Sequence, residues 1–264
     1  MVRLKTQNII KIVLLLLMIS LIILLYSRIY NPKKNIWDAV YNSDYKLAYD
    51  LLQKYPEQSN FIRTDPPFPE RISVLQIAIS HNEKEIINEL LKAGANVNFQ
   101  NHDGHTPLHY ASNKPDIISI LLKYKANPNI KDNNGDTPLH SATNIPEEME
   151  MLLKHGANPN IKNDEGISPF RKTCKESNIN MLKMCIEHGA LVREEQILRY
   201  WFLGLKESRS NNFNERLSIL ELLLNKGALI DVYFFNGIRS SDKLSDKQKR
   251  QIFDTIYKSM KEWE

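Results

Sequence analysis

The sequence predicts an all-α fold: a solenoid of stacked helix-turn-helix pairs with β-turn fingers, preceded by a single N-terminal transmembrane helix. Two observations support it. Similar segments recur every 31 to 33 residues, and residues 12–26 form an apolar run without a charge. Such a period is typical of repeat architectures, because each unit buries its apolar face against its neighbours. We therefore expect an anchor and linker at 1–34, about six repeats at 35–230 and a C-terminal helical cap at 231–264.

The repeated segments share both their residues and their spacing. Leu75, Leu108, Leu139 and Phe170 are 33, 31 and 31 residues apart. The segments that open each unit read SVLQIA (73–78), DGHTPLHYA (103–111), GDTPLHSA (135–142) and EGISPFRKT (165–173). The segments that close a unit read LLKAGANVN (90–98), LLKYKANPN (121–129), LLKHGANPN (152–160), CIEHGALV (185–192) and LLLNKGALI (222–230).

These segments resemble the ankyrin-repeat family, in which Thr-Pro-Leu-His opens a first helix and Leu-Leu-x-x-Gly-Ala ends a second helix before a β-turn. The resemblance covers about residues 35–230. It implies a stack that binds another protein through a concave surface of turn tips and first helices. It also implies that the chain is not an enzyme, has no cofactor and takes no small-molecule substrate.

The residues of each unit fit these positions physically. Proline suits the first turn of a helix, where its missing N–H is not needed, at Pro107, Pro138 and Pro169. Thr106 and Thr137 are predicted to cap these helices and to bond His109 and His140, which ties one repeat to the next. Left-handed backbone is expected where a second helix ends, at Gly94, Gly156, Gly189, Gly227 and Lys125. At Lys125 this conformation should cost about 1 kcal/mol.

Three regions depart from the regular unit. The four prolines of 56–71 predict an extended loop. The sixth repeat is longer than the others, and this predicts a loop at 206–214 between its helices. The tail at 245–263 has a helical pattern, which predicts a packed face formed by Ile252, Phe253, Ile256 and Met260.

The N-terminal apolar segment, residues 9–26, is long enough to cross a thin bilayer. Eighteen helical residues span roughly 27 Å. A cleaved signal peptide is the alternative, but Leu25 and Ser27 are a poor cleavage site. The basic residues on both flanks slightly favour a cytoplasmic N-terminus. This predicts a single-pass protein of the bacterial inner membrane with its repeats in the periplasm.

The charges are unevenly distributed along the sequence. The chain has 35 basic and 31 acidic residues, but residues 1–34 contain six basic residues and no acidic one. The remainder therefore carries 29 basic and 31 acidic residues. A nucleic-acid binder needs basic residues spread over a folded face, so we expect no nucleic-acid partner.

Two groups of residues could form a metal site or a disulfide. His102, His105 and His109 have a spacing that suggests a metal site, but we interpret them as turn and repeat residues and expect no metal. Cys174 and Cys185 are interpreted as small buried residues, and a disulfide between them is the alternative.

Partner-binding residues are predicted on the turn tips and the first helices. These positions are His102, Asp103, His105, Tyr110, Asn113, Asn133, Asn134, Asp136, Ser141, Asn144, Asn163, Asp164, Glu165, Lys172 and Lys175. Tyr110 is the best single anchor, because aromatic residues dominate binding energy at interfaces.

Three functions follow from this organisation. The first is a membrane-tethered, non-catalytic scaffold that binds a partner protein, for example to inhibit it as an immunity-type protein does. The second is a secreted effector with a cleaved signal. The third is an enzyme with a site in the insertions at 56–71 and 196–214. Arg63, Asp65, Glu70 and Arg199 are too few and too scattered to favour the third.

Overall fold

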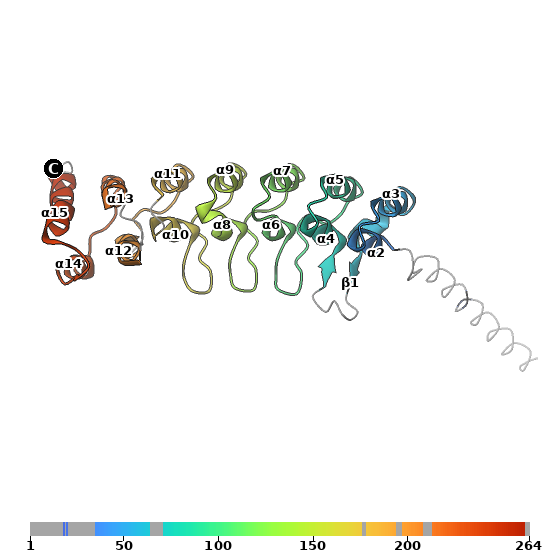
Figure 1. Ribbon diagram of the computed structural model, residues 1–264, viewed down its shortest axis with the longest axis horizontal. Coiled ribbons are helices and arrows are strands. Elements are labelled where there is room, and N and C mark those ends of the chain that lie inside the picture. Colours follow the sequence, from blue (N-terminus) through green and yellow to red (C-terminus); the bar gives the residue numbers. More distant parts are fainter. Residues whose placement is uncertain are drawn as a thin grey trace, which may run out of the picture. The chain divides into compact units, whose positions relative to one another are not determined.

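The computed structural model describes residues 35–63, 71–175, 178–193, 197–207 and 213–261, together with Met18 and Ser20. These residues are mostly helical and fall into two compact units, Met1–Asn96 and Val97–Glu264 (Figure 1). Within each unit, a first helix is followed by a second helix that packs beside it. The predicted helix pairs are confirmed for these residues, which are mostly helical but also contain one short two-stranded sheet.

The predicted membrane segment, residues 9–26, lies outside the described residues apart from Met18 and Ser20. Among the residues with described structure, no helix is both long enough and apolar enough to cross a membrane.

The insertion in the first unit is more regular than an extended loop. The elements of this unit are α2 (Ile36–Tyr41), α3 (Tyr45–Lys54), η1 (Pro56–Asn60), β1 (Ile62–Arg63), β2 (Ile72–Ser73), α4 (Val74–Ser80) and α5 (Lys84–Lys92). β1 and β2 are antiparallel, with Ile62 opposite Ser73. Arg63 forms an ion pair with Asp38 and lies over the buried ring of Trp37. The prediction of an extended loop at 56–71 is therefore wrong for η1 and β1, and residues 64–70 lie outside the described structure.

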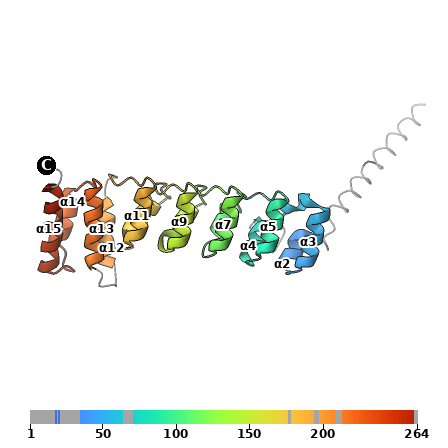
Figure 2. The same cartoon turned by 90° about the horizontal axis from the view of Figure 1, so that it is seen from above.

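The second unit consists of five helix pairs in two layers (Figures 1 and 2). The first helices are α6 (Pro107–Tyr110), α8 (Pro138–Ser141), α10 (Pro169–Lys175), α12 (Ile197–Glu207) and α14 (Val232–Arg239). The second helices are α7 (Pro115–Lys123), α9 (Pro146–Lys154), α11 (Ile179–Glu187), α13 (Phe213–Asn225) and α15 (Asp246–Lys261), and η2 (Ala142–Asn144) follows α8. The predicted prolines begin their helices.

A row of asparagines joins consecutive repeats. Asn129 Oδ1 accepts the N–H of Asn158 at 2.7 Å, and its Nδ2 donates to Gly156 O at 2.9 Å. Asn160 makes the same two bonds to Leu191 N and Gly189 O. Asn98 accepts from Asn127 N in the same way, and in the first unit Asn60 does so from Asn96 N. Each amide thus satisfies backbone groups that end the second helix of the following repeat.

The left-handed residues predicted at the ends of second helices are confirmed. The φ angles are 89° at Gly94, 85° at Gly156 and Gly189, 90° at Gly227 and 63° at Lys125.

A buried arginine holds the sixth repeat together. Arg216 on α13 donates to Cys174 O at 3.1 Å and Trp201 O at 3.2 Å, and also to Lys175 O. Its charge therefore lies at the C-terminus of α10, where the helix dipole favours a cation. Gly204 on α12 leaves room for it, because a Cβ there would lie 2.3 Å from an Arg216 nitrogen.

The sixth repeat is expanded through its helices as well as its loop. The predicted loop at 206–214 is too wide, since α12 continues to Glu207 and α13 begins at Phe213.

The predicted tail helix is confirmed as α15, but its packed face differs from the prediction. Ile252 and Ile256 are buried, whereas Met260 is exposed and Ser259 is buried instead. Phe253 stacks on Phe235 of α14 with ring centroids 5.9 Å apart.

We expect Gly135→Ala to destabilise the protein by roughly 2–4 kcal/mol and Gly166→Ala by only about 1 kcal/mol. Both glycines have positive φ, at 77° and 75°. An added Cβ at Gly135 would lie 2.7 Å from Asp164 Oδ1, whereas at Gly166 it would meet nothing within 4 Å. Thermal unfolding of both full-length variants measures the difference, and equal losses would show that the close approach has no role.

Candidate functional site

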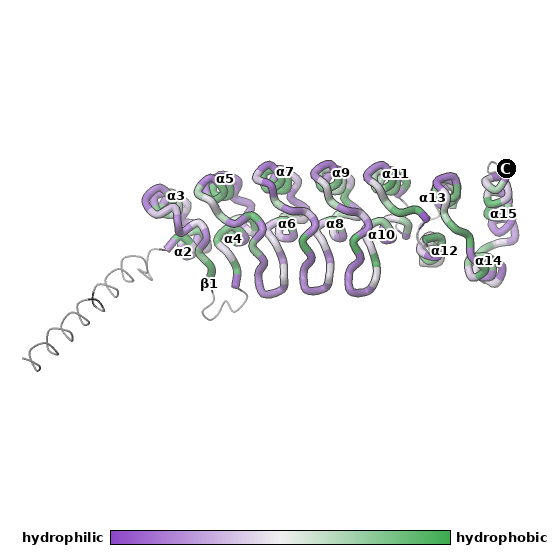
Figure 3. Tube along the Cα trace, turned by 180° about the vertical axis from the view of Figure 1, so that it is seen from behind, coloured by the Kyte–Doolittle hydropathy of each residue, from purple (hydrophilic) through white to green (hydrophobic). Residues whose placement is uncertain are grey.

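The predicted binding surface consists of three turn tips and the first helices of the second unit. We define the turn tips as residues 102–104, 133–135 and 164–166. They project from the ends of α6, α8 and α10 as hydrophilic turns, whereas the helices carry most of the apolar residues (Figures 1 and 3).

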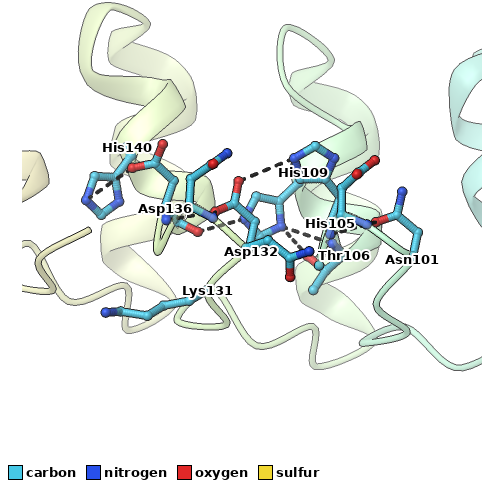
Figure 4. A network of polar contacts seen from close by, with 12 residues as sticks. Asn101, His105, Thr106, His109, Lys131, Asp132, Asp136 and His140 are labelled. Carbon is cyan, nitrogen blue, oxygen red and sulfur yellow. Dashed lines mark hydrogen bonds and ion pairs between the residues drawn. The ribbon is translucent and has the colours of Figure 1, made fainter. Parts of the chain in front are cut away.

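Each of the first two turns is fixed by a threonine–histidine pair (Figure 4). His109 Nδ1 lies 2.8 Å from Thr106 Oγ1 and accepts the Thr106 N–H at 3.1 Å. Its Nε2 lies 3.2 Å from Asp136 O in the next repeat. Because Nδ1 is an acceptor, the ring proton lies on Nε2 and is donated to that carbonyl. Thr137 and His140 repeat the arrangement with Ile167 O, so the predicted tie between repeats is confirmed.

A polar side chain at the base of each turn holds the tip in shape. Asn101 Oδ1 accepts the N–H groups of Asp103 and His105 at 3.0 and 2.8 Å. Asp132 and Asn163 do the same in the next two turns. These Asx turns explain the DNNGD segment.

Neighbouring tips are also joined to each other. Asn133 N donates to Asp103 O at 3.0 Å and Asn133 Nδ2 to His102 O at 2.9 Å. Asp164 N donates to Asn134 O at 3.0 Å. The three tips therefore form one hydrogen-bonded row, in which the backbone of each tip has a defined position relative to the next.

The predicted partner-binding residues fall into two groups. Nine are exposed, namely His102, Asp103, Asn113, Asn133, Asn134, Ser141, Asn144, Asp164 and Glu165. Six are half-buried, namely His105, Tyr110, Asp136, Asn163, Lys172 and Lys175. The second group is less accessible to a partner, because several of these side chains hold the repeats together.

The contacts of the half-buried group show this structural use. His105 Nε2 lies 3.3 Å from Asp132 Oδ2. Tyr110 OH accepts from Asn101 Nδ2 at 3.1 Å, and Asn163 Nδ2 donates to Asp136 Oδ1 at 2.8 Å. Lys172 Nζ donates to His140 O at 2.9 Å.

Three further residues on the first helices, Arg171, Tyr200 and Tyr233, were not predicted, and Arg199 was considered only for the enzyme alternative. Arg171 occupies the place of the histidine in Thr-Pro-Leu-His, and its guanidinium lies 5.1 Å from the Tyr200 ring centroid. Arg199 lies 6.0 Å from the ring of Tyr233, which is 77% exposed. The sequence did contain a signal for Arg171. It replaces the histidine of the two TPLH segments, which bridges repeats, in the corresponding segment SPFR at 168–171.

The other residues considered for chemistry have structural surroundings. Among the described residues, no three histidine, cysteine or acidic side chains are arranged to hold a metal ion. Cys174 and Cys185 are buried, as interpreted, and are not joined by a disulfide, and burial raises the pKa of the Cys185 thiol to about 12. A thiol with this pKa is a poor nucleophile at neutral pH.

We expect stability to fall as the pH drops below about 6.5, because burial lowers the pKa of His109 and His140 from their usual value. Their neutral rings contribute stability that is fully present above the unfolded-state pKa and is lost as protonation removes the Nδ1 acceptor. Thermal unfolding of the full chain from pH 7.5 to 5 measures this trend.

Replacing His109 and His140 with Gln should flatten the pH dependence. Replacing His155 and His188, which are exposed at the ends of α9 and α11, with Gln should preserve it. An unchanged slope in the first variant would contradict the assignment.

Comparison with known proteins agrees with this geometry. Residues 36–132 and 75–163 match the family described as ankyrin repeats (3 copies). A search of curated proteins found no match. The matched residues include both threonine–histidine turns and the first two tips. The chain therefore contains ankyrin repeats, which cover residues 36–163.

Proposed function

We propose that this protein is a non-catalytic scaffold that binds a partner protein through the turn tips and first helices of its second unit. Ankyrin repeats generally mediate binding to other proteins. The observation that carries the proposal is the hydrogen-bonded row of tips. It fixes the backbone that carries the exposed side chains, so little backbone conformational entropy is lost on binding.

The tips carry acidic side chains that are available to a partner. Asp103, Asp164 and Glu165 are exposed, while the Asx residues beneath them are engaged in the turns. This separation lets the exposed residues be changed without disturbing the row. They are therefore better test positions than Tyr110 or Asp136.

Replacing Asp103 and Asp164 with Ala should weaken partner binding roughly tenfold and leave the unfolding temperature nearly unchanged, since exposed substitutions usually alter stability by less than about 0.5 kcal/mol. The partner is first isolated by crosslinking to the full chain in its native cells, and its affinity for both forms is then measured.

The matched control is Glu147→Ala with Glu187→Ala, which removes two exposed acidic side chains from the second helices α9 and α11. Partner binding that is equally insensitive to both pairs of substitutions would argue against the tips as the binding surface.

We also propose that residues 9–26 tether the scaffold to a membrane, with the repeats in the periplasm of a bacterium. The support is the apolar composition of this segment and the basic residues that flank it. Within such an arrangement the scaffold would restrain a partner near the bilayer. An immunity-type protein that neutralises a toxin is one form of this role.

Protease treatment of intact cells and of spheroplasts tests the tether. We expect the repeats to be digested only in spheroplasts and the mature N-terminus to remain Met1 or Val2. A mature protein that begins near Arg28 and is recovered from the medium would instead establish the secreted alternative.

A further inference from the structure

Two leucines replace an asparagine that recurs after the second helices. The segment GANPN at 156–160 corresponds to GALVR at 189–193 and to GALID at 227–231. In the first of these segments, Asn158 Oδ1 accepts the N–H of Asn160 at 2.9 Å. Leu191 and Leu229 stand in the place of Asn158, and their side chains are 60% and 57% exposed. The last two turns therefore have an exposed apolar side chain where the earlier turns have a polar contact.

The backbone that carries the two leucines is regular. Ala190 N donates to Cys185 O and Ala228 N donates to Leu223 O, each at 2.9 Å, and the same bond closes the earlier repeats. A single exposed leucine is common on protein surfaces and needs no explanation. Two exposed leucines at equivalent positions of adjacent repeats form a pattern, which points to a use for this surface.

Each leucine lines an open hollow beside the second helices. The hollow at Leu191 has a volume of about 520 Å³ and is also lined by Ile186 of α11 and Val192. The hollow at Leu229 has a volume of about 290 Å³ and is also lined by Met260 of α15. Because α13 packs against both α11 and α15, the two hollows follow one another along the layer of second helices, which lies opposite the turn tips (Figures 1 and 2).

The two hollows differ in charge. Arg193 and Lys226 line the hollow at Leu191, both are exposed, and neither forms an ion pair with another described residue. The hollow at Leu229 is lined by no charged side chain of the described part of the chain. This surface therefore complements a ligand that offers one apolar side chain to each hollow and a carboxylate near the first.

The separation of the two leucines favours a helical ligand. Packed helices lie roughly 8–10 Å apart, so equivalent residues of adjacent repeats have about this separation. Residues i and i+7 of an α-helix lie on one face, about 10 Å apart. Residues on one face of a β-strand are about 7 or 13 Å apart, which does not match the repeat.

We infer that Leu191, Leu229 and their two hollows bind an amphipathic helix of another protein. We call this region the leucine surface. The helix carries apolar residues at i and i+7 and an acidic residue beside the apolar side chain that enters the hollow at Leu191, where Arg193 and Lys226 pair with it. The leucine surface is separate from the turn tips and first helices, so this is a second binding surface beyond the proposed one.

A designed peptide tests the binding of such a helix to the full chain. The fluorescein-labelled peptide has about 18 residues, is rich in alanine for helix formation, and carries two leucines seven residues apart with a glutamate beside the first. In the control peptide of the same composition the leucines are five residues apart, which places them on different faces of the helix. We expect the first peptide to bind at least roughly tenfold more tightly. Equal binding of the two peptides would overturn the inference.

Leu191→Asn with Leu229→Asn should weaken binding of the first peptide roughly tenfold or more. These substitutions restore the residue of the earlier repeats, so the unfolding temperature should not fall. The matched control is Leu203→Asn with Tyr233→Asn, which removes two exposed apolar side chains from the first helices α12 and α14 and should leave binding unchanged. Equal losses in the two variants would refute the leucine surface as the binding site.

Arg193→Gln with Lys226→Gln tests the charge of the first hollow. This variant should bind the peptide roughly threefold or more weakly than the natural chain does. It should bind a peptide with glutamine in place of the glutamate as tightly as the natural chain does. A loss of the same size for both peptides would show that the two cations do not pair with the carboxylate.

Two other occupants of the leucine surface give different results. Self-association of the full chain that is lost in the leucine variant, without peptide binding, would assign the surface to a second copy and overturn the inference. Binding to vesicles of phosphatidylcholine and phosphatidylglycerol with the same dependence, again without peptide binding, would assign it to a membrane and overturn it too. The scaffold function is tested separately through Asp103 and Asp164, so it stands or falls independently of the peptide.

Discussion

The second unit depends on backbone groups of one repeat being satisfied by side chains of its neighbour. Asparagine amides at positions 98 and 129 bond the ends of the next second helices, and histidine rings bond the base of the next turn. The histidine bonds are partly buried, where an unsatisfied backbone group is costly, and the asparagine bonds recur at the exposed ends of the second helices. Together these contacts favour one register between repeats. Helices as short as α6, with four residues, would not be stable without such support.

The polar residues of the turns are therefore of two kinds. One kind bonds the backbone of the turn, as Asn101, Asp132 and Asn163 do, and the other kind, at the tips, faces solvent. A similar division separates the pairs of first helices. α6 and α8 contain no lysine, arginine or acidic residue, whereas α10 contains Arg171, Lys172 and Lys175. The acidic tip at 164–166 therefore directly precedes a first helix with basic residues.

The repeat period, the helix pairs and the threonine–histidine ties could be predicted from the sequence, because each rests on residues that are close together and recur. Interactions between residues far apart in the sequence could not be predicted. Arg216 bonds carbonyls that lie 41 and 42 residues earlier, and nothing near it in the sequence indicates a buried cation. Glu148 is buried where the preceding repeat has Ile117, and it accepts the N–H groups of Asn113 and Lys114. The exposure of Asn163 and Asp136 was misjudged because asparagine and aspartate serve equally well as surface residues and as turn supports.

The change from histidine to arginine at position 171 has a consequence for how the repeat array can grow. Between Asn98 and Asn160 the asparagine and histidine contacts recur at intervals of 31 residues, so a whole copy could be added or removed there in frame. Beyond Arg171 the geometry differs, because only six residues separate Ala190 from Ile197, compared with eleven between Ala157 and Pro169. A copy inserted after that point would follow Arg171, whose guanidinium lies over the ring of Tyr200, and not a histidine that bonds a carbonyl of the next repeat. Gene duplication, or a designer extending the array, is thus confined to the central units.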